Sequence, residues 1–135
     1  MNYKNVKRII VGVFACVCVA NITIPTIADT VKFNITVGQK VNKDPLSKRT
    51  KKRDDEQKFY VTATAFGDIG SVRSTSVWKN TGKKSATITL KSSEIDRKKS
   101  GVYPASNAKA GEYYYLKSVW NSGPSELNVK GRYTP

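Results

Sequence analysis

Apolar and polar residues alternate one by one in several stretches of this chain, and this alternation constrains its fold more than any other feature. Between residues 31 and 37 every second residue is apolar, and the residues between them are Lys, Asn and Thr. Successive side chains of a β-strand point to opposite faces of its sheet, so the pattern predicts a strand with one buried face. A second clear case lies at 57–66, where one face holds Phe59, Val61, Ala63 and Ala65.

The alternation predicts about six strands, and their apolar positions hold many of the β-branched and aromatic residues that favour strands. We expect them at residues 31–37, 57–66, 71–79, 85–91, 112–120 and 125–133. Turn residues at 80–83 and 121–124 separate consecutive strands, and one helical turn is expected around 92–99. Six antiparallel strands cannot bury the apolar face of a single sheet. The predicted fold class is therefore all-β, as a small antiparallel β-sandwich or a partly open barrel.

Residues 1–28 have the features of a secretory signal peptide, which would form a signal helix ahead of the β domain. A basic start is followed by an uncharged apolar run over 9–20, and 26–28 holds the small residues of a cleavage site. The run is shorter than the roughly 20 residues that span a bilayer, which argues against an uncleaved anchor. The same segment is also compatible with a lipoprotein anchored at Cys16, and with cleavage after Ala20.

Removal of the leader would leave a single secreted β domain over residues 29–135. Both cysteines lie in the leader, so this domain forms no disulfide and is held together by packing alone. The leader contains only three of the 24 basic residues, and most of the formal net charge of +14 therefore belongs to the domain. No apolar run in the domain is long enough for a transmembrane segment. We expect an extracellular protein, free or loosely associated with the cell wall.

The most distinctive feature of the domain is a block of positive charge within the long connection 38–56. Three acidic residues at 54–56 follow this block directly. Its five basic residues lie within six positions: Lys48, Arg49, Lys51, Lys52 and Arg53. Such a block binds phosphate-rich polymers and releases their counterions. We expect an anionic cell-wall polymer or a membrane surface as the partner, and no specific nucleic acid. The competing interpretations are a solvated loop neutralised by its acidic neighbours, and a protease-sensitive loop.

A run of aromatic residues marks the fifth predicted strand. Tyr113 and Tyr115 point to one face of this strand, whereas Tyr114, Leu116 and Trp120 point to the other. Either the strand is central and covered on both faces, or one face exposes rings that stack on sugars, peptides or a protein partner. The candidate aromatic surface consists of Tyr113, Tyr115 and Trp120.

The predicted domain lacks the usual catalytic and metal-binding side chains. The chain has no His, and no Cys follows the leader, which excludes His-based triads, thiol nucleophiles and His-ligated zinc. Residues 81–85 are better explained as a hairpin turn than as a phosphate loop. Glu94 and Asp96 would form a carboxylate pair only in an extended segment with basic neighbours. The sequence therefore predicts no enzyme, no metal site and no cofactor.

Segments 51–61, 110–116 and 131–135, together with the first strand, resemble a family of small secreted proteins of Gram-positive bacteria. That family is known only as a domain of unknown function. Tyr133 stands where Trp is common in the family. The resemblance implies secretion and a β-rich fold, and it brings no catalytic residues to this chain.

Two expectations for function follow. The first is a secreted, non-catalytic β-sandwich that binds anionic cell-envelope polymers through its basic loop. The second is a bacteriocin-like cationic protein that acts on the envelopes of competing bacteria. An enzyme that uses carboxylates or lysine ranks last.

Overall fold

The computed structural model describes residues 29–104 and 107–135, so the predicted signal peptide lies outside the described residues. Within this part of the chain there are eight strands and one short 3-10 helix. In chain order they are β1 (Val31–Gly38), β2 (Thr50–Lys51), β3 (Lys58–Phe66), β4 (Ser71–Trp78), β5 (Ile88–Lys91), η1 (Ser92–Glu94), β6 (Lys98–Val102), β7 (Tyr113–Ser122) and β8 (Glu126–Thr134).

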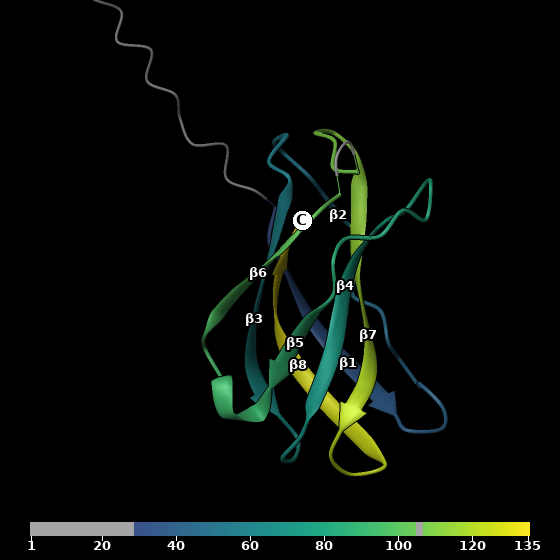
Figure 1. Ribbon diagram of the computed structural model, residues 1–135, viewed down its shortest axis with the longest axis vertical. Helices are drawn as coiled ribbons and strands as arrows, with labels where there is room; N and C mark the ends of the chain where they lie inside the picture. Colours follow the sequence, from purple (N-terminus) through teal and green to yellow (C-terminus); the bar gives the residue numbers. More distant parts are fainter. Residues whose placement is uncertain (1–28, 105–106) are drawn as a thin grey trace, which may run out of the picture.

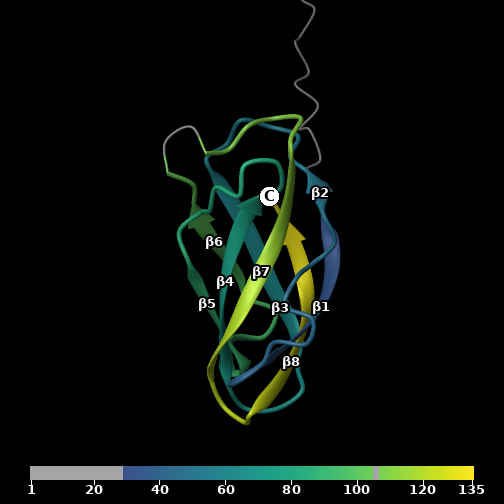
Figure 2. The same ribbon diagram turned by 90° about the vertical axis from the view of Figure 1, so that its right-hand side faces the viewer.

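The strands form two four-stranded antiparallel sheets that face each other (Figures 1 and 2). The strand order is β1-β8-β3-β6 in one sheet, called here the β8 sheet, and β2-β7-β4-β5 in the other, called the β7 sheet. The chain changes sheets at every connection between consecutive strands except the one from β4 to β5, so many neighbours within a sheet are distant in sequence. The all-β prediction is confirmed, and of the two predicted architectures the structure is the sandwich.

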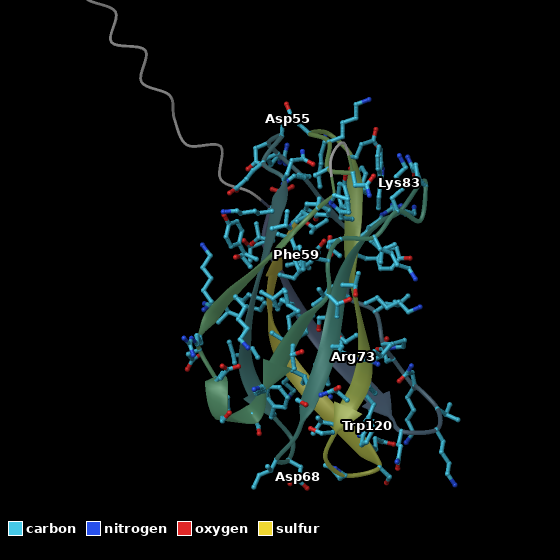
Figure 3. All side chains as sticks on the ribbon, viewed as in Figure 1. Asp55, Phe59, Asp68, Arg73, Lys83 and Trp120 are labelled. Atoms are coloured by element: carbon cyan, nitrogen blue, oxygen red, sulfur yellow. The ribbon has the colours of Figure 1, made fainter. Side chains whose placement is uncertain are left out.

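The core between the sheets is built from the apolar positions that the alternation marks. In β1 the side chains of Phe33, Ile35 and Val37 are buried, and in β3 those of Phe59 and Val61. Figure 3 shows the Phe59 side chain between the two sheets. Burial of one such side chain stabilises the fold by about 1.5 to 3 kcal/mol, so these alternating faces hold the two layers together.

One residue predicted to share the buried face of β3 is exposed instead. The pairing of β3 with β8 shifts register between Ala63 and Ala65, which is a β-bulge. An extra residue in one strand reverses the alternation beyond it. Ala63 is therefore buried and Ala65 is exposed.

The structure has two strands more than predicted, and neither shows the alternation. β2 lies inside the connection 38–56, which was expected to contain no strand, and β6 begins within the helical turn expected around 92–99. Only η1 remains of that turn. In β6 the inward position is Gly101, where an added Cβ would lie 2.1 Å from the Phe59 ring. Because glycine fills this position, the sequence of β6 carries no apolar signal.

Buried hydroxyl groups form a hydrogen-bonded cluster between the two sheets. The Oγ of Ser76 lies 2.6 Å from the hydroxyl oxygens of both Tyr103 and Tyr133. Burial away from water raises the pKa of both phenols above the usual value, so both are neutral. Within residues 29–104 and 107–135 every buried side-chain nitrogen or oxygen atom has a hydrogen-bond partner.

Candidate functional site

The basic block predicted from the sequence is divided among different environments. Lys48 and Arg49 are exposed, whereas Lys51 is half-buried within β2. Arg53 forms an ion pair with Asp29, with 2.9 Å between its Nη2 and the carboxylate Oδ2, and its Nε donates to the same oxygen. The block is therefore not one uniform patch of free charge.

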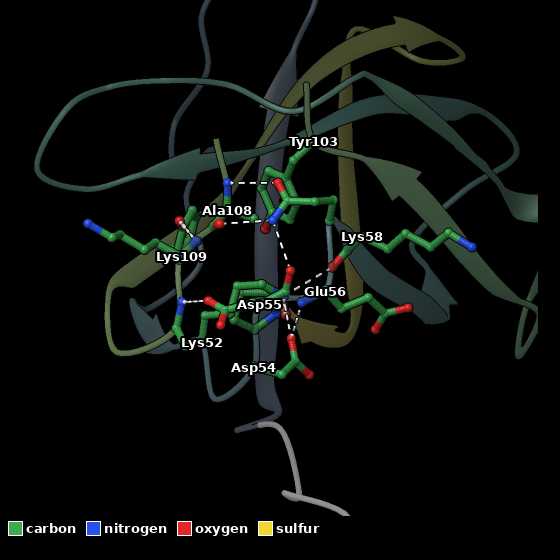
Figure 4. Close-up of polar contacts among 12 residues, drawn as sticks. Lys52, Asp54, Asp55, Glu56, Lys58, Tyr103, Ala108 and Lys109 are labelled. Carbon is green, nitrogen blue, oxygen red and sulfur yellow. Dashed lines mark hydrogen bonds and ion pairs between the residues drawn. The ribbon is translucent and has the colours of Figure 1, made fainter. Parts of the chain in front are cut away.

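Lys52, the remaining member of the block, lies inside the fold with a side chain only 1% exposed (Figure 4). Its ammonium group is 2.9 Å from Oδ1 of Asp54 and 5.6 Å from the centroid of the Tyr103 ring, and it donates to the main-chain oxygens of Lys58 and Pro135 at 3.3 and 3.0 Å. These contacts tie the segment before β3 to the residues after β8. Lys52 is thus a structural cation, and its ammonium group is not accessible to a polymer.

A groove of about 760 Å³ lies beside β1, on the outer face of the β8 sheet. Its charged lining consists of four basic side chains and one acidic side chain: Lys32, Lys48, Lys130, Arg132 and Asp44. Asn34, Ser47 and Thr64 add uncharged polar groups, and the remaining lining residues are Phe33, Leu46 and Gly131. The groove with its four basic residues is called the basic groove below.

The pairing of β1 with β8 brings three of these cations together. Lys32 lies directly opposite Arg132, and Asn34 lies opposite Lys130. Among the described residues, no ion pair includes any of the four cations of the groove. Like charges directly opposite each other destabilise an antiparallel sheet. The pair of Lys32 and Arg132 therefore lowers the stability of the free protein and creates a position where an anion would bind favourably.

The fourth cation, Lys48, comes from the connection between β1 and β2, which is fixed against both sheets. The main chain of this connection pairs with β1 at Asp44 and with β7 at Leu46. Ser47 and Leu116 exchange two hydrogen bonds of 2.8 Å, one of which runs from the Leu116 amide to the Ser47 hydroxyl. These bonds hold Lys48 at the rim of the groove, so the long connection is not a free loop.

We expect Lys32→Gln to stabilise the free protein by about 0.2 to 1 kcal/mol, because it removes the repulsion with Arg132. Urea denaturation at low ionic strength measures this gain, which should shrink at high salt as the repulsion is screened. Lys43→Gln is the matched control, since Lys43 is paired with Glu126 at 2.7 Å. It should give no stabilisation. A Lys32→Gln variant that is less stable than the parent would contradict the assignment of repulsion to this pair.

The three residues of the predicted aromatic surface lie on opposite faces of β7. Tyr113 is 42% exposed, and the guanidinium carbon of Arg49 lies 5.4 Å from its ring centroid. Tyr115 is half-buried on the same outer face of the β7 sheet. Trp120 packs against the core, and its Nε1 donates to the main-chain oxygen of Pro124 at 2.8 Å. The structure thus brings Tyr113 and Tyr115 together but places Trp120 away from them.

The carboxylates considered as a catalytic pair have separate roles in the structure. Glu94 forms ion pairs with Lys99 and Arg97, and the hydrogen bond from Lys99 lowers the pKa of its carboxyl. Asp96 adopts a left-handed backbone conformation with φ of 62° at the turn before β6. In the part of the chain that the structure describes, no three His, Cys, Asp or Glu residues come close enough to hold a metal ion.

Comparison with known proteins adds no assignment to these features. No protein-family model matches the chain, and no curated protein matches it either. Across residues 29–104 and 107–135 there is no helix of the length and apolar character needed to cross a membrane. The function is therefore argued from the residues themselves.

Sequence reasoning did not identify three of the four cations of the groove: Lys32, Lys130 and Arg132. Each occupies a polar position of a predicted strand, which is the only local signal that it faces solvent. The alternation does not say that the first and last strands of the domain are neighbours, nor in which register they pair. Without that pairing the three residues are isolated charges.

Proposed function

We propose that this protein is a secreted, non-catalytic β-sandwich that binds anionic polymers of the cell envelope through the basic groove. The observation that carries the proposal is the set of four cations around one groove with a single carboxylate among them. The proposal keeps Lys48 from the predicted basic block and adds the cations of β1 and β8. Lys52 and Arg53 are omitted because they are paired with Asp54 and Asp29. Arg49 and Lys51 are omitted because they do not line the groove.

The chemistry of the groove suits phosphate groups in particular. Arg132 carries a planar guanidinium that donates two parallel hydrogen bonds to a phosphate, whereas the three lysines act as point charges. Hydroxyl groups of Ser47 and Thr64 and the amide of Asn34 add neutral hydrogen-bond partners in the same walls. A phosphate-bearing polymer that replaced its counterions with these cations would gain affinity from the release of the ions.

Binding to purified cell walls across a salt series tests the proposed function. If four phosphates are contacted, the logarithm of the binding constant should fall against the logarithm of salt concentration with a slope of about −3. A variant that neutralises the groove should lose most of this retention: Lys32→Gln, Lys48→Gln, Lys130→Gln and Arg132→Gln. The unsubstituted protein provides the comparison, and circular dichroism checks that the variant is folded.

A matched control removes the same number of charges elsewhere on the domain. Four exposed basic residues of the β7 sheet and its connections are suitable: Arg73, Lys79, Lys84 and Lys91. Their replacement by Gln should leave most of the retention in place. If the two fourfold variants lost retention equally, net charge rather than the groove would explain binding, and the proposal would be wrong.

The second candidate function, a bacteriocin-like action on membranes, is favoured by a different observation. Ile69 and Ile95 are 82% and 43% exposed, and with Phe66 they line a shallow pocket next to Asp68, at one end of the sandwich (Figure 3). Exposed aliphatic side chains on a cationic protein favour insertion into anionic membranes. Dye release from anionic vesicles that is lost in Ile69→Ser would support this candidate, and an absence of dye release would argue against it.

A further inference from the structure

Basic side chains continue beyond the groove in a row across the β8 sheet. Lys32 of β1 lies opposite Arg132 of β8, which in turn lies opposite Thr62 of β3, and Thr62 lies opposite Lys98 of β6. The three basic residues are exposed on the outer face of the sheet. Neighbouring strands are about 4.8 Å apart, so the row extends about 14 Å from β1 to β6. We call Lys32, Arg132 and Lys98 the cationic row.

The far end of the row is held in place by an aromatic ring and forms no ion pair. The ammonium of Lys98 lies 4.2 Å from the centroid of the Tyr60 ring, and the Tyr60 hydroxyl donates to Glu56 at 2.6 Å. Lys98 forms no ion pair with any described residue, whereas the adjacent Lys99 is paired with Glu94. The fold thus supplies a carboxylate to one lysine of β6 and leaves the outward one unpaired.

We propose that the cationic row extends the basic groove into a track, and that its ligand is a linear polymer of phosphodiester units that crosses the strands from Lys48 to Lys98. This inference rests on the proposed function and adds the direction and the minimum length of the bound chain. A single phosphate group contacts cations of the groove only. Only a chain that passes the uncharged Thr62 reaches the last cation of the track.

The shape of the site favours a polymer over a membrane as the occupant. The track begins in a recessed groove, where a flexible chain can enter. A bilayer surface instead contacts the most protruding side chains, and the most exposed large apolar side chain, Ile69, lies outside the track at the end of the sandwich. The cations of the track are therefore positioned to contact successive phosphates of one polymer chain.

Two phosphodiester probes of different length test the track. The short probe is a thymidine dinucleotide, followed by NMR shifts, and the long probe is an oligothymidylate of about 16 nucleotides, followed by fluorescence anisotropy. Lys98→Gln should weaken binding of the long probe about two- to five-fold and reduce the salt slope by about 0.7, without affecting the short probe. Lys32→Gln should weaken binding of both probes.

Arg73→Gln is the control, because it removes one exposed charge from the outer face of the opposite sheet. It should leave both affinities nearly unchanged. A wall-derived phosphodiester polymer should show the same dependence on Lys98 as the oligonucleotide, which identifies the shared chemistry. All variants are first compared with the parent by urea denaturation, so that a loss of binding is not a loss of folding.

The outcomes separate this inference from the function on which it rests. If Lys32→Gln weakens binding but Lys98→Gln and Arg73→Gln are equivalent, the track is wrong and the groove remains the binding site. If neither row variant weakens binding, the proposed function fails as well. If anionic vesicles bind with the same dependence on Lys98 and displace the long probe, the occupant is a membrane and the polymer track is overturned.

Discussion

Raising the pH from 10 to 12 is expected to remove about 5 kcal/mol from the free energy of unfolding through Tyr103 and Tyr133, the two tyrosines of the buried hydroxyl cluster. In the unfolded chain a phenol ionises near pH 10, whereas burial raises the pKa of both groups in the folded protein. The unfolded state therefore releases protons first. The stabilisation is fully present below pH 10 and falls above it by about 1.4 kcal/mol per pH unit for each tyrosine.

Urea denaturation at a series of pH values between 9 and 12 measures this loss. Tyr133→Phe should remove about half of the loss that comes from the cluster, because one of its two phenols no longer titrates. Buried Tyr114, whose pKa is also raised by burial, is present in both proteins and does not enter the difference. Tyr113→Phe is the matched control, since this ring is exposed on the outer face of β7. Its curve should run parallel to that of the parent. Equal slopes for the two variants would contradict the role of the buried cluster.

The second large effect is expected from Lys52→Ala, which should destabilise the fold by about 3 to 5 kcal/mol. The substitution leaves a cavity where the alkyl chain was, and it removes the donor for the main-chain oxygens of Lys58 and Pro135. Buried carbonyl groups that lose their partner keep the full cost of desolvation. Denaturation midpoints in guanidinium chloride measure the change.

Two comparisons separate the role of this lysine from that of its neighbours in the sequence. Lys52→Met retains most of the volume, so its smaller loss of stability reports the polar contacts without the cavity. Lys48→Ala, on the exposed rim of the groove, should change stability by less than about 0.5 kcal/mol while it weakens binding to cell walls. The assignment of Lys52 to the interior would be refuted if Lys52→Ala were as stable as Lys48→Ala.

The buried faces of the strands could be predicted because they depend on a local pattern. A strand with one buried face shows that face in its own sequence, as β1 does with Phe33, Ile35 and Val37. The pattern failed where another element supplied the packing. Gly101 of β6 is covered by the ring of Phe59, and the exposure of Ala65 follows from a bulge in the pairing with β8.

The candidate site was only partly visible in the sequence, for the same physical reason. A run of basic residues is easy to find, but it does not show which of them are solvated. Lys48 lies on the groove, whereas Lys52, four positions later, is enclosed by Tyr103, Asp54 and the end of β8. Burial of a charge depends on atoms that are distant in sequence.

By itself, the sequence determined that this chain forms strands with alternating faces, that these faces pack together in an all-β sandwich or barrel, and that the chain after residue 28 is strongly basic. Only the tertiary structure decided which cations share a surface. Lys32 and Arg132 are 100 positions apart, and the register between β1 and β8 places them opposite each other. Alternation is set by neighbours along the chain, whereas register is set by the packing of the whole sandwich, so the groove and its track arise only when the sheets close on their core.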